Sequence, residues 1–127
     1  MITVTHLLAV GIGAALGAVC RWLLGLWLNH AGAFVPWGTL AANYIGAYAI
    51  GVAIALVLQM PSVPDWLRLF LVTGFLGGLT TFSTFSAETF GLLQRGDLWQ
   101  AFSYVFISLF GALALTALGV YSGQRLF

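Results

Sequence analysis

Charged side chains are scarce in this sequence. Its 127 residues include four arginines, no lysine and three acidic residues, so charged residues make up 6% of the chain and the net charge is +1. Soluble domains carry roughly 25% charged residues, whereas 61% of this chain is hydrophobic. The composition therefore indicates a protein that lies in a lipid bilayer. It leaves no basic surface for binding nucleic acid.

Cysteine and histidine are almost as rare. Cys20 is the only cysteine, which excludes an internal disulfide framework, a cysteine-rich zinc site and an iron–sulfur cluster. The two histidines, His6 and His30, lie far apart in the sequence and indicate no metal site. Because no nucleophile–base pair or metal-ligand cluster can be assembled from these residues, we do not expect an enzyme.

Four long apolar stretches divide the chain, and each has the length that a membrane-spanning helix needs. They cover about residues 4–28, 36–60, 65–93 and 98–122. The first stretch is not typical of a cleaved signal, because no basic residue precedes it. We therefore expect an all-α membrane protein whose residues 1–127 form a single domain of four transmembrane helices.

The arginines are distributed evenly between the two sides that four spans would define. Arg68 and Arg125 fall on one side, Arg95 falls on the other, and Arg21 lies nearer to the side of Arg95. Since positive charge sets the orientation of membrane proteins, this balance favours insertion in both orientations and antiparallel pairing of the chain with itself. Self-association is also expected because four helices are too few to enclose a polar path. Small residues spaced four apart let helices approach closely, as in the pairs Gly13/Gly17, Gly74/Gly78 and Gly119/Gly123.

The third apolar stretch contains three glycines followed by five hydroxyl side chains, between Gly74 and Ser86. Glycine and threonine are weak helix formers, so Gly77-Gly78 near the middle of the span predicts a helix that is broken there. Unwound backbone at membrane depth occurs only where protein buries it or where it lines a water-filled path. Its carbonyls can bind a cation, and the N-terminus of the following half-helix attracts an anion.

Two phenylalanines and an asparagine are candidates for contact with an ion. Phe82 and Phe85 are three residues apart and share one helix face, where the positive ring edges could contact a small anion. The same rings could instead pack against a neighbouring helix. Asn43 in the second stretch could donate a hydrogen bond to an anion or join two helices, a frequent use of asparagine in membranes.

The fourth stretch carries hydroxyl groups on one face, at Tyr104, Ser108 and Thr116. They could form a ladder of donors, although serine and threonine also bond to their own preceding turn. Arg21 and Glu88 are the charges placed deepest within the spans, and such charges face the bundle interior or a water cavity. Arg21 could attract anions at a vestibule or extend towards the first loop. Glu88 could instead be the structural partner of a hydroxyl or an arginine.

Three motifs resemble the Fluc (CrcB) family of fluoride channels. They are the glycine-rich segment Gly13–Arg21, the GTLxxN pattern in Trp37–Asn43, and the GxxGGxTTFSTF pattern in Gly74–Phe85. The third motif is highly specific, and the resemblance covers essentially the whole chain. It implies a dual-topology antiparallel homodimer, multi-pass in the inner (plasma) membrane of a bacterium. It also implies that two pores conduct fluoride passively down its gradient and so prevent its toxicity.

The resemblance also implies a role for each matching residue. The fluoride pore and its vestibules would be lined by Arg21, Thr39, Asn43, Phe82, Phe85, Glu88, Tyr104 and Ser108. The backbone carbonyls of Gly77 and Thr80 would hold a structural sodium ion at the centre of the dimer. Ala112 departs from a continuous polar track, because it occupies the step between Ser108 and Thr116.

Two other functions are compatible with four short helices. A small dual-topology, proton-coupled multidrug exporter would need an acid deep in its first helix, where this chain carries Arg21. A non-transporting assembly subunit would use the small-residue faces alone. It would leave the broken third helix and the aligned hydroxyls without a purpose.

Overall fold

A computed structural model describes all residues from Met1 to Phe127. It is entirely helical, with four helices long and apolar enough to cross a membrane, as the sequence predicts: Val4–Leu28, Trp37–Gln59, Asp65–Gln94 and Leu98–Leu126. The first, second and fourth are α1 (Val4–Leu28), α2 (Trp37–Gln59) and α6 (Leu98–Leu126). The third span is built from four consecutive elements: α3 (Asp65–Arg68), the π-helix η1 (Leu69–Leu76), α4 (Gly77–Leu79) and α5 (Ser83–Gln94).

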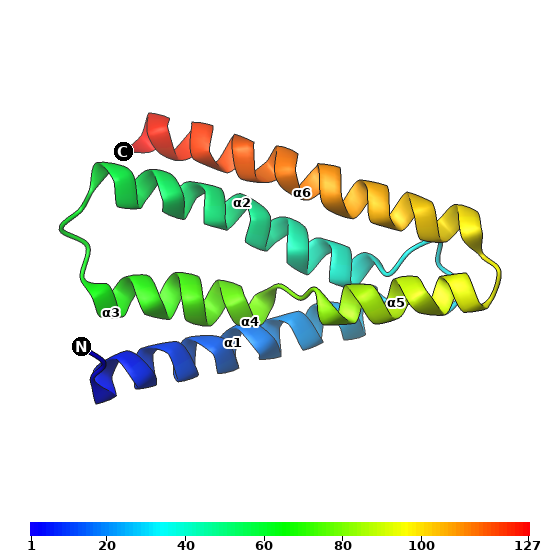
Figure 1. The fold of residues 1–127 in the computed structure, drawn as a ribbon, viewed down its shortest axis with the longest axis horizontal. Coiled ribbons are helices and arrows are strands. Elements are labelled where there is room, and N and C mark those ends of the chain that lie inside the picture. Colours follow the sequence, from blue (N-terminus) through cyan, green and yellow to red (C-terminus); the bar gives the residue numbers. More distant parts are fainter.

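The helices form an elongated up-and-down bundle (Figure 1). Helix α6 lies along α2, and α1 lies along the first half of the third span. Both termini lie at one end of the bundle with the connection between α2 and α3, and the other two connections lie at the opposite end. Only 19 of the 127 residues are buried, so most of the apolar surface is available to lipid or to a second copy of the chain.

Glycines allow the close contact between α1 and the third span. A Cβ atom added at Gly13 would overlap the carbonyl of Phe70, and one at Gly17 would overlap the carbonyl of Phe75. A Cβ atom at Gly78 would likewise overlap the carbonyl of Ala14. These predicted small-residue pairs therefore hold helices together within one chain, because only hydrogen atoms fit between the two backbones.

The interruption of the third span lies beyond the glycines that were expected to cause it. Gly77 and Gly78 are helical, whereas Thr80 is extended with φ −89° and ψ 156°, and helix resumes at Ser83. The predicted position of the break at Gly77-Gly78 is thus wrong by about one turn. The physical reason is that Gly78 is used for close approach to α1, while the polar contacts that hold the chain open act on Thr81.

Candidate functional site

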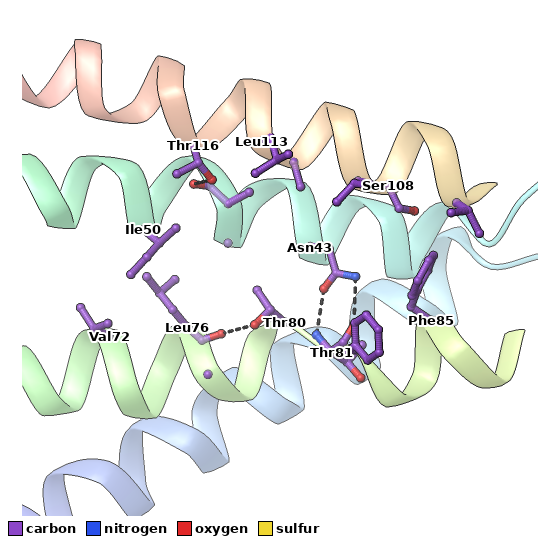
Figure 2. A pocket seen from close by; sticks show the side chains of 17 residues that line it. Asn43, Ile50, Val72, Leu76, Thr80, Thr81, Phe85, Ser108, Leu113 and Thr116 are labelled. Atoms are coloured by element: carbon purple, nitrogen blue, oxygen red, sulfur yellow. Dashed lines mark hydrogen bonds between the residues drawn. The ribbon is translucent and has the colours of Figure 1, made fainter. Parts of the chain in front are cut away.

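The side-chain amide of Asn43, on α2, forms two hydrogen bonds with the non-helical segment of the third span. Its Nδ2 donates to the Thr81 carbonyl at 3.1 Å, and its Oδ1 accepts from the Thr81 backbone N–H at 2.8 Å. Figure 2 shows this pair of bonds between α2 and the non-helical segment. The amide thereby replaces the helical hydrogen bonds that the Thr81 backbone lacks, as backbone groups at membrane depth require. Asn43 joins two helices and still has a second Nδ2 hydrogen to donate.

Two threonine hydroxyls of the third span form hydrogen bonds with backbone groups on either side of the interruption. Thr80 Oγ1 donates to the Leu76 carbonyl at 2.8 Å, which also accepts from the Thr80 backbone N–H. Thr81 Oγ1 accepts from the Thr84 backbone N–H at 3.1 Å. This second bond satisfies one of the free N–H groups at the start of α5, as an N-terminal capping residue does.

These contacts release two backbone carbonyls from the helical pattern. In a continuous α-helix, the Gly77 carbonyl would accept from the Thr81 N–H and the Thr80 carbonyl from the Thr84 N–H. Both N–H groups instead donate to the side chains of Asn43 and Thr81. Gly77 and Thr80 are therefore suited to bind a cation, since free carbonyls of interrupted membrane helices coordinate sodium.

The interruption faces a groove of about 860 Å³ between the third span, α2 and α6. The groove is mostly apolar, which is typical of ligand sites that carry a few placed polar groups. The residues expected in a pore that line it are Asn43, Phe82, Phe85 and Ser108. Gly77, Thr80 and Ala112 also line the groove, whereas Arg21, Thr39, Glu88 and Tyr104 do not.

The two phenylalanine rings lie together at the groove. Their centroids are 5.7 Å apart, with the ring planes tilted by 54°. Phe82 is 79% exposed, whereas Phe85 is partly buried and makes an edge-to-face contact with Tyr104, with centroids 5.0 Å apart. Phe82 is therefore free to meet another molecule or a second chain, while packing holds Phe85 in place.

The hydroxyls expected on α6 have different environments. Ser108 Oγ is buried and has no hydrogen-bond partner within the chain. Thr116 Oγ1 donates to the Ala47 carbonyl of α2 at 3.0 Å, and Tyr104 is fully buried away from the groove. Because Ala112 has no hydroxyl and Thr116 is bonded to α2, Ser108 is the one residue of α6 in the groove lining whose hydroxyl has no partner in the chain.

Glu88, in the middle of α5, joins this helix to α2 and α6. Its carboxylate accepts from Thr39 Oγ1 of α2 at 2.9 Å and from the Tyr104 hydroxyl of α6 at 2.8 Å. Tyr104 also contacts the Phe85 ring, and Glu88 lines a second, more polar cavity of about 680 Å³ beneath the connections between helices. The cluster of Thr39, Glu88 and Tyr104 thus lies between the groove and this cavity.

Arg21 points towards the interruption. Its Nε donates to the Gly78 carbonyl at 3.0 Å, whereas the sequence suggested either a vestibule or the first loop as its environment. Sequence reasoning did not identify this contact, nor the role of Thr81. The two pairs are separated by 57 and 38 positions along the chain, so no local pattern could have indicated them.

The sequence profile of a family described as "CrcB-like protein, Camphor Resistance (CrcB)" matches residues 8–120. The chain belongs to the CrcB family. A CrcB-family relative from Bordetella petrii is 60% identical over 121 residues, which cover 95% of this chain and 93% of the relative. One from Bordetella avium is 58% identical, covering 94% of each chain, and one from Thiobacillus denitrificans is 56% identical, covering 93% of this chain and 95% of the relative. Each of these relatives is named a fluoride-specific ion channel, FluC.

The family resemblance drawn from the sequence motifs is therefore confirmed. This CrcB-family chain is a multi-pass membrane protein, and its named relatives are ion channels rather than enzymes. The interruption of the third span lies within Gly74–Phe85, one of the three segments on which the resemblance rested, and several residues of this segment line the groove.

Proposed function

We propose that the chain is a fluoride-selective passive channel in the inner membrane of a bacterium, where it exports fluoride down its gradient and prevents its toxicity. The observation that carries this proposal is the groove beside the interrupted third span, which is lined by Phe82 and Phe85 of that span, Asn43 of α2 and Ser108 of α6. The proposal is supported by the relatives at 56 to 60% identity that are named fluoride-specific channels.

The chemistry of the groove suits a small, tightly hydrated anion. Such an ion enters a pore only if closely spaced donors replace its water. Ser108 Oγ has no partner within the chain, and Asn43 retains an amide hydrogen. The ring edges of Phe82 and Phe85 carry partial positive charge. None of these groups carries a full charge, and no lysine is present to trap the ion. Several weak sites in series favour exit as well as binding.

A second copy of the chain would complete the pore. The groove is open on one side and Phe82 is largely exposed there, so one chain leaves the ion in contact with lipid. We propose an antiparallel homodimer, consistent with the even arginine distribution, in which each copy contributes the same groove and two pores result. The carbonyls of Gly77 and Thr80 from both copies would hold a structural sodium ion between them.

The test of fluoride conduction is efflux from liposomes that contain the purified protein, measured with a fluoride electrode in sodium-containing buffer. We expect rapid fluoride loss driven by the gradient alone, and little efflux when the same liposomes are loaded with chloride. Empty liposomes provide the control for leak. No fluoride efflux from a verified dimer would overturn the proposed function.

Antiparallel pairing has a separate test, because added lysines fix the orientation of a membrane protein. One variant carries Ser62→Lys and Gln124→Lys, and the other carries Ala31→Lys and Gln94→Lys at the opposite end; all four positions are exposed. We expect neither variant to conduct by itself and the co-expressed pair to regain fluoride efflux. Wild-type efflux from either variant alone would contradict antiparallel pairing.

A further inference from the structure

Arg21 is a charged residue in the middle of the bundle without an acidic partner. The two ion pairs of the structure are Arg68 with Asp65 and Arg95 with Asp97. The hydrogen bond that Arg21 forms within the chain is the one from Nε to the Gly78 carbonyl, at 3.0 Å. Its terminal nitrogens have no partner in the chain and are not buried. An intramembrane charge of this kind needs a physical explanation, because it is costly to place there.

The interruption of the third span provides that explanation. The first half of the span ends at Leu79, and the last carbonyls of a helix lack N–H partners and form the negative end of its dipole. Cationic side chains stabilise such an end by bonding to the last carbonyls. Gly78 lies in this final turn, and its carbonyl oxygen accepts from Arg21 Nε. A carbonyl left without a partner is costly at membrane depth.

Helix α1 holds Arg21 in a fixed position relative to that carbonyl. Gly13 and Gly17 contact the backbone of η1 closely, and Gly78 contacts the backbone at Ala14. These contacts leave no room for α1 to slide along the third span, because any displaced side chain would overlap a backbone carbonyl. The donor is therefore positioned by the packing of α1, as a residue that orients a site must be.

We propose that Arg21 is a positioning residue that caps the Gly78 carbonyl and so orients the adjacent free carbonyls, Gly77 and Thr80, towards the groove. In this role the directed hydrogen bond from Nε matters more than the net charge. The competing role is electrostatic attraction of fluoride into a vestibule, in which the charge alone matters. The flux measurement below rests on the proposed function, whereas the stability measurement does not.

Three substitutions separate a directed donor from a charge. Arg21→Gln keeps an N–H donor at the same number of bonds from Cα as Nε of arginine, but it removes the charge. Arg21→Lys keeps the charge and places its donor one bond further out, with a methylene where Nε was. Arg21→Met has neither donor nor charge. Arg125→Gln is the matched control, since Arg125 is exposed at the end of α6 and bonds only to Tyr121.

The stability of the dimer is the first measurement, taken as the thermal midpoint in detergent with and without sodium. We expect Arg21→Gln to stay close to wild type and to keep its sodium-dependent stabilisation. Arg21→Met should lose most of that stabilisation, and Arg21→Lys should fall between them. The proposal would be overturned if Arg21→Gln and Arg21→Met had equal thermal midpoints and equal responses to sodium while Arg21→Lys behaved like wild type. This result would count even if the protein does not conduct fluoride.

Fluoride efflux is the second measurement, made at low and saturating fluoride and at two ionic strengths. If the hydrogen bond from Arg21 Nε to the Gly78 carbonyl orients the site, Arg21→Met should lose about tenfold in efflux, within the range for one intramolecular hydrogen bond. The loss should persist at saturating fluoride and high salt. Charge attraction predicts instead that Lys resembles wild type, and that Gln and Met share a defect that salt and high fluoride reduce. That second pattern would overturn the proposal.

Discussion

Replacement of Asn43 by leucine removes the two hydrogen bonds that keep the Thr81 backbone out of the helix. Leucine has nearly the same shape as asparagine, so packing is retained while both bonds to the Thr81 backbone are lost, at 3.1 Å and 2.8 Å. Hydrogen bonds between membrane helices contribute about 0.6 kcal/mol each on average. A buried backbone group left without a partner costs about 1–3 kcal/mol. Because the Thr81 N–H and the Thr81 carbonyl both lose their partner, we expect Asn43→Leu to lower the free energy of unfolding by about 2–6 kcal/mol.

The assay is equilibrium unfolding in detergent, followed by fluoride efflux from liposomes for the protein that still folds. Thr89→Val is the matched control, because it removes one local hydrogen bond, from Thr89 Oγ1 to the Phe85 carbonyl at 2.8 Å. It should cost less than about 1 kcal/mol and leave efflux close to wild type. Unchanged stability of Asn43→Leu would refute the claim that the Asn43 amide stabilises the interruption. A destabilised variant with wild-type efflux would show that conduction does not need the interruption in this form.

Three further predictions concern helix contact, the rings and the cation. Gly17→Ala should destabilise the protein by about 1–3 kcal/mol, the usual cost of overpacking, whereas Gly11→Ala, which has open space around it, should be neutral or stabilising in the same unfolding assay. Phe82→Ile and Phe85→Ile should each reduce fluoride efflux while size-exclusion chromatography still shows a dimer; wild-type efflux would remove the ring edges from the pathway. Replacing sodium by N-methylglucamine throughout should lower the thermal midpoint of the dimer, and indifference to sodium would argue against the carbonyl site.

The spans could be predicted from the sequence because hydropathy is a local property. The first stretch was predicted at 4–28, and α1 covers Val4–Leu28. The last span was predicted to end at residue 122, where polar residues begin, but α6 continues to Leu126. In this final turn Arg125 donates to the Tyr121 hydroxyl at 2.7 Å and lies over its ring. A polar final turn can therefore stay helical where the sequence pattern suggests an end.

The arrangement of the site was less predictable, because it depends on contacts between distant segments. Thr39, Glu88 and Tyr104 were recognised as candidates, but their mutual hydrogen bonds join α2, α5 and α6 across up to 49 positions. The position of the interruption was misjudged for a similar reason. The low helix propensity of glycine favours a break at Gly77-Gly78. The hydrogen bond from the Thr81 N–H to Asn43 instead determines where the helix is interrupted. Propensity is a weak guide wherever tertiary contacts satisfy the backbone.

The most direct test of a passive fluoride channel is the zero-current voltage across a planar bilayer that contains the protein. A tenfold fluoride gradient, balanced by chloride so that only the anion species differ, should give a zero-current voltage near the fluoride equilibrium potential of about 59 mV. A passive fluoride channel gives this value with the polarity of an anion, and the voltage does not change when a pH gradient is added. A voltage near zero, or one that follows the pH gradient, would contradict fluoride selectivity or passive conduction and would favour the proton-coupled exporter.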